Sequence, residues 1–194
     1  MPVMVTDLRF DNRNATVTHP CSDTCACRRL IACDLVQHHV DQLDCPAGFQ
    51  QQIEGIGSFI GHADVVVIEG AAFAKARLQG MDQLSAMRWM VRQLLWERGI
   101  PYAVVPPNSR IIYATGKARW AGETPLQVKG RVRTAVVERY GIECEGPSRY
   151  DRADAFVLAA MGLDQLGWPL VEVEPIYRRA LAGVEWPDIL AATG

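Results

Sequence analysis

One apolar run in the middle of the chain decides the fold: His62-Ala63-Asp64-Val65-Val66-Val67-Ile68-Glu69-Gly70. Consecutive β-branched residues of this kind are typical of a strand that is buried on both faces of a parallel sheet. The run ends in the acid Glu69, and Gly70 follows, where the lack of a side chain lets backbone or ligand approach closely. Ligands of open α/β sheets usually bind beyond the strand ends, so Glu69 stands where a functional site would form.

The patterns on both sides of this strand predict the other elements. Before it, we expect short strands over residues 2–8, 15–18 and 29–36 and an amphipathic helix over 48–61. After it, we expect a helix over 81–98, a strand over 100–105, a loop-rich stretch over 108–122, and helices over 124–140 and 150–166. Hairpin strands followed by strand and helix alternation predict an α/β domain, a mixed sheet with helices on both faces.

Length and composition favour one ordinary globular domain. The chain has 194 residues and a net charge of −2, which argues against a protein that coats nucleic acid by electrostatics alone. We expect a domain over residues 1–166 and a C-terminal tail over 167–194. Apolar runs are short and the first residues lack the pattern of a signal peptide, so we expect no membrane association and a cytoplasmic location.

A second informative stretch is Tyr150-Asp151-Arg152-Ala153-Asp154-Ala155-Phe156-Val157-Leu158-Ala159-Ala160. Residues three apart lie on one face of a helix, so the carboxylates of Asp151 and Asp154 would converge on one cation, and magnesium takes oxygen ligands of this kind. The alternative is structural: Asp151 would cap the first turn and Asp154 would complement the helix dipole. The two residues alone do not decide between these interpretations.

Five of the six cysteines fall between Cys21 and Cys45. The stretch from Cys21 through Cys25 to Cys27 has the ligand types of a soft-metal site, and a non-catalytic binding module that contains zinc is one hypothesis for the protein. The spacing lacks the paired C-x-x-C knuckles of common zinc folds, so free thiols are the favoured interpretation.

The order of elements resembles the RuvC-type Holliday-junction resolvases of the RNase H-like nuclease superfamily, with phage-type members as one option. Four stretches carry the resemblance: Val3-Met4-Val5-Thr6-Asp7-Leu8, Val65-Val66-Val67-Ile68-Glu69-Gly70, Gly99-Ile100-Pro101-Tyr102-Ala103-Val104-Val105-Pro106-Pro107, and Asp151-Arg152-Ala153-Asp154-Ala155-Phe156-Val157-Leu158-Ala159. They resemble, in order, the strand with the first catalytic acid, the strand with the catalytic Glu, the strand and proline after the long helix, and the helix with a D-x-x-D-A pattern.

The resemblance implies an RNase H-like mixed sheet flanked by helices, and a site in which Asp7, Glu69, Asp151 and Asp154 are catalytic residues and metal ligands. Mg²⁺ would be the cofactor, with Mn²⁺ able to replace it, since carboxylates that clamp two ions are suited to phosphodiester cleavage. The implied activity is that of an endodeoxyribonuclease that resolves four-way junctions by paired symmetric nicks as a homodimer. A related nuclease that cuts forks, flaps or other branched DNA is the alternative.

The first strand departs from the family pattern, because the glycines that follow the family's acid are absent after Asp7. Asp11 is therefore a rival for the first metal ligand. Asp34 is a weaker rival, because a ligand there would leave too little chain before Glu69 for the usual hairpin and helix.

Aromatic and basic residues around these motifs are candidates for DNA contacts. Phe73 resembles the aromatic that stacks on bases at the junction centre, although a core position is an equal alternative. The family usually has a lysine near the place of Pro125, and Arg110, Lys117 or Arg119 would take over its phosphate contact. The predicted DNA-binding residues are Phe73, Lys75, Arg77, Arg110, Lys117 and Arg119.

Overall fold

The structure, a computed structural model, describes residues 7–11, 14–18, 29–33, 46–61, 63–71 and 81–188. Its strands are β1 (Asp7–Asp11), β2 (Asn14–Thr18), β3 (Arg29–Cys33), β4 (Val65–Glu69) and β5 (Tyr102–Val105). Its helices are α1 (Pro46–Ile60), α2 (Met81–Glu97), α3 (Pro107–Thr115), α4 (Pro125–Tyr140), α5 (Arg149–Gln165) and α6 (Pro175–Arg178), with a 3₁₀ turn at Arg179–Gly183. None of the described helices is both long and apolar enough to cross a membrane.

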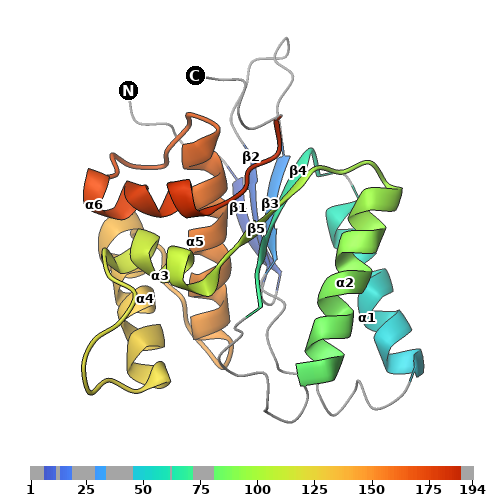
Figure 1. The fold of residues 1–194 in the computed structure, drawn as a ribbon, viewed down its shortest axis with the longest axis horizontal. Helices are drawn as coiled ribbons and strands as arrows, with labels where there is room; N and C mark the ends of the chain where they lie inside the picture. The colour runs from blue at the N-terminus through green and yellow to red at the C-terminus, as the bar shows by residue number, and fades with distance from the viewer. Residues whose placement is uncertain are drawn as a thin grey trace.

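The strands form one mixed sheet in the order β1-β2-β3-β4-β5, which confirms the predicted α/β class. The strand pairs β1 with β2 and β2 with β3 are antiparallel, whereas β3, β4 and β5 run parallel. Helices α1 and α2 lie on one side of the sheet, and α3, α4 and α5 lie on the other (Figure 1). The strand predicted over residues 2–8 overlaps β1 only at Asp7 and Leu8, because residues 1–6 lie outside the described part.

Strand β4 is buried on both faces, as its apolar run predicts. Val65 and Val67 belong to the core on the side of α5, and Val66 and Ile68 belong to the core on the side of α2; all four side chains are 0% exposed. Because successive side chains of a strand alternate between faces, one uninterrupted apolar run supplies both cores. This double burial fixes where the strand ends, and therefore where Glu69 lies.

Helix α5 is the centre of the larger core. Every side chain from Ala153 to Asp164 is buried, and the helix contacts β2, β3 and β4 on the sheet and α3 and α4 outside it. The N-cap residue is Ser148, which makes no side-chain capping bond, and Asp151 is the third residue of the helix. Asp151 is therefore not the N-cap that the structural interpretation of the sequence assumed.

Helix α4 begins as its sequence predicts. The Thr124 side chain accepts a hydrogen bond from the backbone of Gln127, whose side chain in turn accepts one from the Thr124 backbone, so the two form a capping box ahead of Pro125. At the other end, Gly141 adopts a φ of +68°, a conformation that favours glycine.

The predicted loop over residues 108–122 is wrong in its first half, because Pro107–Thr115 forms helix α3. Pro107 lies at the first helical position and Gly116 ends the helix with a φ of +78°, which are ordinary start and stop signals. The polar residues at 108–110 favoured a loop in the sequence analysis despite these signals. The helix is stabilised by tertiary packing, since Tyr113 and Ala114 are buried in the core beside α5.

The residues after α5 pack against the same core. Ala180, Leu181 and Val184 are buried members of the α5 cluster, and Trp186 donates its indole N–H to the carbonyl of Leu181 at 3.0 Å. Packing thus continues beyond Leu166, where the sequence divides the chain into domain and tail; that division stays a prediction.

A buried acid at the end of α5 joins this C-terminal segment to the helix. Asp164 is 1% exposed, accepts a hydrogen bond from the Tyr113 hydroxyl at 3.1 Å, and lies 3.0 Å from the Arg178 guanidinium. Burial raises the pKa of Asp164, and the Arg178 charge and the Tyr113 hydrogen bond oppose that rise. Burial dominates because the Arg178 side chain is about half exposed, at 54%, and its charge is screened by water.

This raised pKa makes the stability depend on pH. A carboxyl whose folded pKa lies above its unfolded value stabilises the fold fully at low pH, and that contribution is lost as pH rises through the folded pKa. We expect the free energy of unfolding of the wild type, relative to Asp164→Asn, to decrease as pH rises above about 4. Urea unfolding of both proteins from pH 4 to pH 8 measures this difference. A difference that grows with pH would mean that pairing with Arg178 outweighs burial.

Candidate metal and nucleic-acid site

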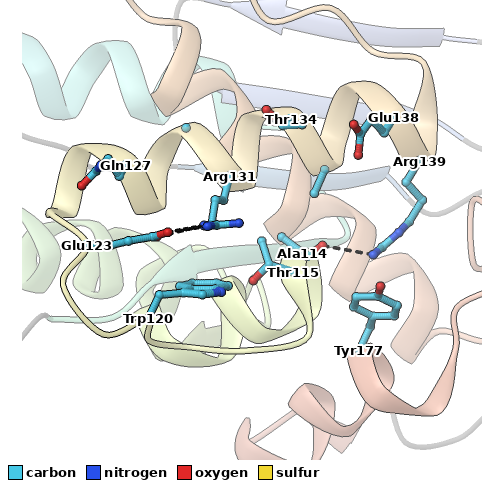
Figure 2. Close-up of a pocket in the computed structure, with 12 residues that line it drawn as sticks. Ala114, Thr115, Trp120, Glu123, Gln127, Arg131, Thr134, Glu138, Arg139 and Tyr177 are labelled. Carbon is cyan, nitrogen blue, oxygen red and sulfur yellow. Dashed lines mark hydrogen bonds and ion pairs between the residues drawn. The ribbon is translucent and has the colours of Figure 1, made fainter.

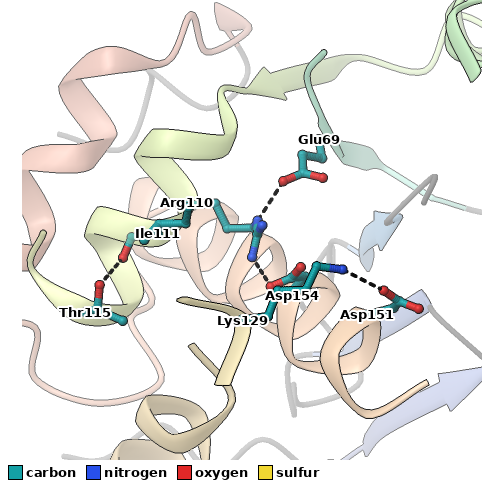
Figure 3. A network of polar contacts seen from close by, with 7 residues as sticks. All are labelled: Glu69, Arg110, Ile111, Thr115, Lys129, Asp151 and Asp154. Atoms are coloured by element: carbon teal, nitrogen blue, oxygen red, sulfur yellow. Dashed lines mark hydrogen bonds and ion pairs between the residues drawn. The ribbon is translucent and has the colours of Figure 1, made fainter. Parts of the chain in front are cut away.

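Three buried acids lie where the carboxyl end of β4 meets α5. Glu69 is the last residue of β4 and is 7% exposed; Asp151 and Asp154 lie in the first half of α5 and are 3% and 1% exposed. Glu69 and Asp154, which are far apart in the sequence, are brought together because α5 packs on the sheet beside β4. The structure therefore unites these two predicted site residues and places Asp151 one helical turn away (Figure 3).

Arg110 of α3 joins the two carboxylates. Its Nε donates to Glu69 Oε1 at 2.8 Å, and its Nη1 donates to Asp154 Oδ1 (Figure 3). The arginine is itself only 5% exposed. A predicted phosphate-binding residue thus lies between two predicted metal ligands. Both predictions concerned separate contacts, and neither anticipated that the three side chains would bind one another.

A second cation lies beside the third acid. Lys129 of α4 places its ammonium 3.4 Å from Asp151 Oδ1, and its side chain is 36% exposed whereas that of Asp151 is 5% exposed. Lysine side chains reach a site edge in this way by burying their stems and keeping the charged end near water. The site therefore holds three carboxylates against two cations, one buried and one at the rim.

The donor set fits a hard divalent cation in its chemistry. Each of the three acids offers carboxylate oxygens, which Mg²⁺ and Mn²⁺ prefer. Asp154 Oδ2 is buried and makes no hydrogen bond within the described part of the chain. Within that same part, however, no three His, Cys, Asp or Glu side chains converge closely enough to hold an ion. A metal ion here would need a further carboxylate, or a shift of Asp151 toward Glu69 and Asp154.

The register of the sheet does not bring Asp7 to Glu69. Asp7 pairs with Thr18, which pairs with Arg29 at the amino-terminal end of β3. That end lies beside the beginning of β4, since Leu30 pairs with Val65. Asp7 is therefore at the opposite end of the sheet from Glu69, and on the strand at the edge.

Asp11 is at the correct end of the sheet but on a distant strand. It pairs with Asn14, Asn14 pairs with Cys33, and Cys33 pairs with Ile68, the neighbour of Glu69. Three strand spacings of about 4.8 Å separate β1 from β4, or about 14 Å in all.

The carboxyl ends of two strands lie directly beside that of β4: β5, through the pair Val105 and Glu69, and β3, through the pair Cys33 and Ile68. The residue after Cys33 is Asp34, which lies outside the described residues. If Asp34 were the first ligand, the family pattern would place a hairpin after it. The structure has its hairpin, β1 and β2, before β3.

The other predicted DNA-binding residues divide into two groups. Phe73, Lys75 and Arg77 lie outside the described residues, so their roles stay predictions. Lys117 and Arg119 are exposed in the segment between α3 and α4.

Of the cysteines, Cys21, Cys25, Cys27 and Cys45 also lie outside the described part, and Cys144 is a buried free thiol whose pKa is raised by burial.

A groove of about 640 Å³ lies beside the site and was not anticipated from the sequence. Gly70 and Ala71, which follow Glu69, line it together with the prolines that follow β5. Its charged and aromatic lining residues are Arg88, Trp89, Arg92 and Arg119, and its described lining includes no carboxylate. Trp89 is 68% exposed, and the Arg92 guanidinium lies 5.0 Å from the centre of its ring. The sequence did contain one indication of this groove: Arg88 and Arg92 lie on either side of Trp89 in a predicted helix.

A second hollow of about 770 Å³, between α3, α4 and α6, is different in character (Figure 2). Arg131 donates to Glu123 and lies 5.0 Å from the Trp120 ring centre. Arg139 donates to backbone carbonyls of α3 and lies 3.9 Å from the ring centre of Tyr177. Both guanidinium groups are thus engaged within the protein, so this hollow is a structural junction between elements.

Comparison with known proteins gives a weak likeness. No family model and no curated protein matches the sequence. Among solved structures, the Thermus thermophilus RuvC structure is 15% identical with a TM-score of 0.44, over 79% of this chain and 89% of that chain. A structure of T. thermophilus RuvC in complex with Holliday junction substrate is 14% identical with a TM-score of 0.46, over 80% of this chain and 89% of that chain. Because both TM-scores are below 0.5, the likeness carries no argument about function, which has to be inferred from the side chains of the site.

Proposed function

We propose that the chain is a metal-dependent endonuclease that cuts branched DNA, with the four-way junction as its substrate and a homodimer as its active form. The observation that carries the proposal is the convergence of Glu69 and Asp154, buried from two elements, on one point beside a groove lined with arginines. Buried carboxylates are costly to retain, so their concentration beside a basic surface favours a catalytic role. The junction and the homodimer come from the motif resemblance.

Each group then has a role in cleavage. Glu69, Asp154 and Asp151 would hold the divalent metal ions, which when bound would activate water and stabilise the leaving oxygen. Lys129 at the rim and Arg119 in the groove are positioned to bind phosphates, and Arg is suited to bidentate phosphate contacts. Trp89 offers a flat aromatic surface to an unpaired base, which branched DNA exposes and intact duplex does not.

We predict that Glu69→Gln and Asp154→Asn each reduce cleavage to background while leaving DNA affinity within about threefold, because loss of a metal ligand spares the phosphate contacts. The measurement is incubation with labelled four-way junction, fork and flap substrates, with and without Mg²⁺ or Mn²⁺, together with a gel-shift titration in EDTA. Glu172→Gln, an exposed carboxylate outside the site, is the matched control. Normal cutting by either site variant would exclude the proposed centre.

We also propose that a further carboxylate comes from the amino-terminal strands. The register favours an acid at the carboxyl end of β3 or β1 over Asp7, because those ends lie on the Glu69 side of the sheet. We therefore expect Asp34→Asn or Asp11→Asn, rather than Asp7→Asn, to match Asp154→Asn in loss of cleavage. Loss in Asp7→Asn alone would restore the assignment that the motif resemblance implies.

The lining of the groove leads to a separate prediction about the affinity for DNA. Trp89→Ala is expected to weaken binding of a forked substrate about tenfold, since one base stacked on an aromatic ring contributes about 1–3 kcal/mol. Trp96→Ala is the matched control, because Trp96 is 74% exposed on the same helix and does not line the groove. Fluorescence anisotropy in EDTA measures binding without cleavage. Equal weakening by both substitutions would contradict a specific role for the groove.

A further inference from the structure

Arg110 is held in a place that an ordinary phosphate-binding arginine does not occupy. Its side chain is 6% exposed, and two of its nitrogens donate to carboxylates that are themselves 9% and 2% exposed. An arginine side chain stays protonated in proteins, so its charge cannot be removed to make room for another cation. The guanidinium must either stay between the two acids or move away as a cation.

The atoms that Arg110 contacts are the atoms that the proposed metal site would use. Its guanidinium donates hydrogen bonds to Glu69 Oε1 and Asp154 Oδ1, one oxygen of each carboxylate. A guanidinium between two carboxylates and a metal ion bound by both would need the same space. Asp154 Oδ2, which is buried and makes no hydrogen bond with any described residue, is the oxygen that Arg110 leaves open to an arriving cation.

We propose that Arg110 is an internal counter-cation which a divalent metal ion displaces from Glu69 and Asp154, and that the released guanidinium then binds a phosphate of the DNA. This inference rests on the proposed metal-dependent cleavage and describes how metal binding at the same site is regulated. Before metal arrives, Arg110 compensates the buried negative charge and keeps the two carboxylates in position.

Displacement couples metal binding to DNA binding. A released guanidinium gains most when a phosphate is present to accept its hydrogen bonds. By linkage, DNA that stabilises the released arginine raises metal affinity by the same factor by which metal raises DNA affinity. The site would therefore load metal weakly when it is alone and more tightly on its substrate.

Lys129 provides an internal comparison, because it also places a positive charge beside a site carboxylate. Its ammonium lies 3.4 Å from Asp151, and its side chain is 36% exposed, so it is screened by water and blocks only the rim. If Arg110 acts merely as a nearby positive charge, removal of either cation should have a similar effect on metal affinity. If Arg110 occupies the ligand position, its removal should have the larger effect.

The test is a Mn²⁺ titration, without DNA, of the wild type, Arg110→Gln, Arg110→Lys and Lys129→Gln, with free Mn²⁺ followed by electron paramagnetic resonance. We expect Arg110→Gln to bind Mn²⁺ at least about tenfold more tightly than the wild type, and Lys129→Gln less than about threefold. Arg110→Lys, which keeps a point charge without the fork of donors, should fall between them and serves as the second variant if Arg110→Gln unfolds. Thermal unfolding with and without Mn²⁺ checks folding.

A second titration adds a four-way junction with phosphorothioate linkages that resist cleavage. We expect the junction to tighten Mn²⁺ binding to the wild type and to have a smaller effect on Arg110→Gln. Equal Mn²⁺ affinity in the wild type and Arg110→Gln, with cleavage intact in the wild type, would overturn displacement and leave the nuclease function standing. No Mn²⁺ binding by any variant, with no cleavage of any branched substrate, would overturn the nuclease function as well.

Discussion

The structure depends on how the charges between β4 and α5 are compensated. Moving an ion from water into a protein interior costs several kcal/mol even after relaxation, and that cost is offset only by close pairing with good geometry. Glu69 and Asp154 are both paired with Arg110, which α3 supplies, and Asp151 is paired with Lys129 from α4. The packing of α3 and α4 against α5 is thus tied to the site as well as to the apolar core.

Elements with strong local signals were predicted well from the sequence. Strand β4 follows from its apolar run, α4 from its cap and its final glycine, and α5 from its unbroken apolar stretch around Asp154. Helix α3 was missed although Pro107 and Gly116 mark its ends, because polar residues stand between these signals and the packing against α5 that stabilises the helix is not visible in the local sequence. Local pattern is sufficient where it agrees with tertiary packing, and it fails where packing alone stabilises the element.

The sequence singled out Glu69 and Asp154, which the structure brings together, but not the contacts between them; their role as metal ligands stays a prediction. Glu69 and Asp154 were assigned to one site through the motif resemblance, because an acid at a strand end or near the start of a helix is not decisive by itself. The Arg110 contacts join residues 41 and 44 positions apart in the chain, and no local pattern shows that an arginine will be buried between them. The strand order was not predicted for a similar reason, since pairing of β3 with β4 is a long-range property of the sheet.

The burial of α5 also limits how the protein can change in evolution. The helix carries Asp154 to the site and Asp164 to the C-terminal segment, and a helix turns about 100° per residue. Insertion or deletion of one residue between them would rotate one acid away from its partner while the other stayed in place. The part of α5 between Asp154 and Asp164 is therefore expected to tolerate substitution but not insertion or deletion, whereas the surface segment between α3 and α4 has no such constraint.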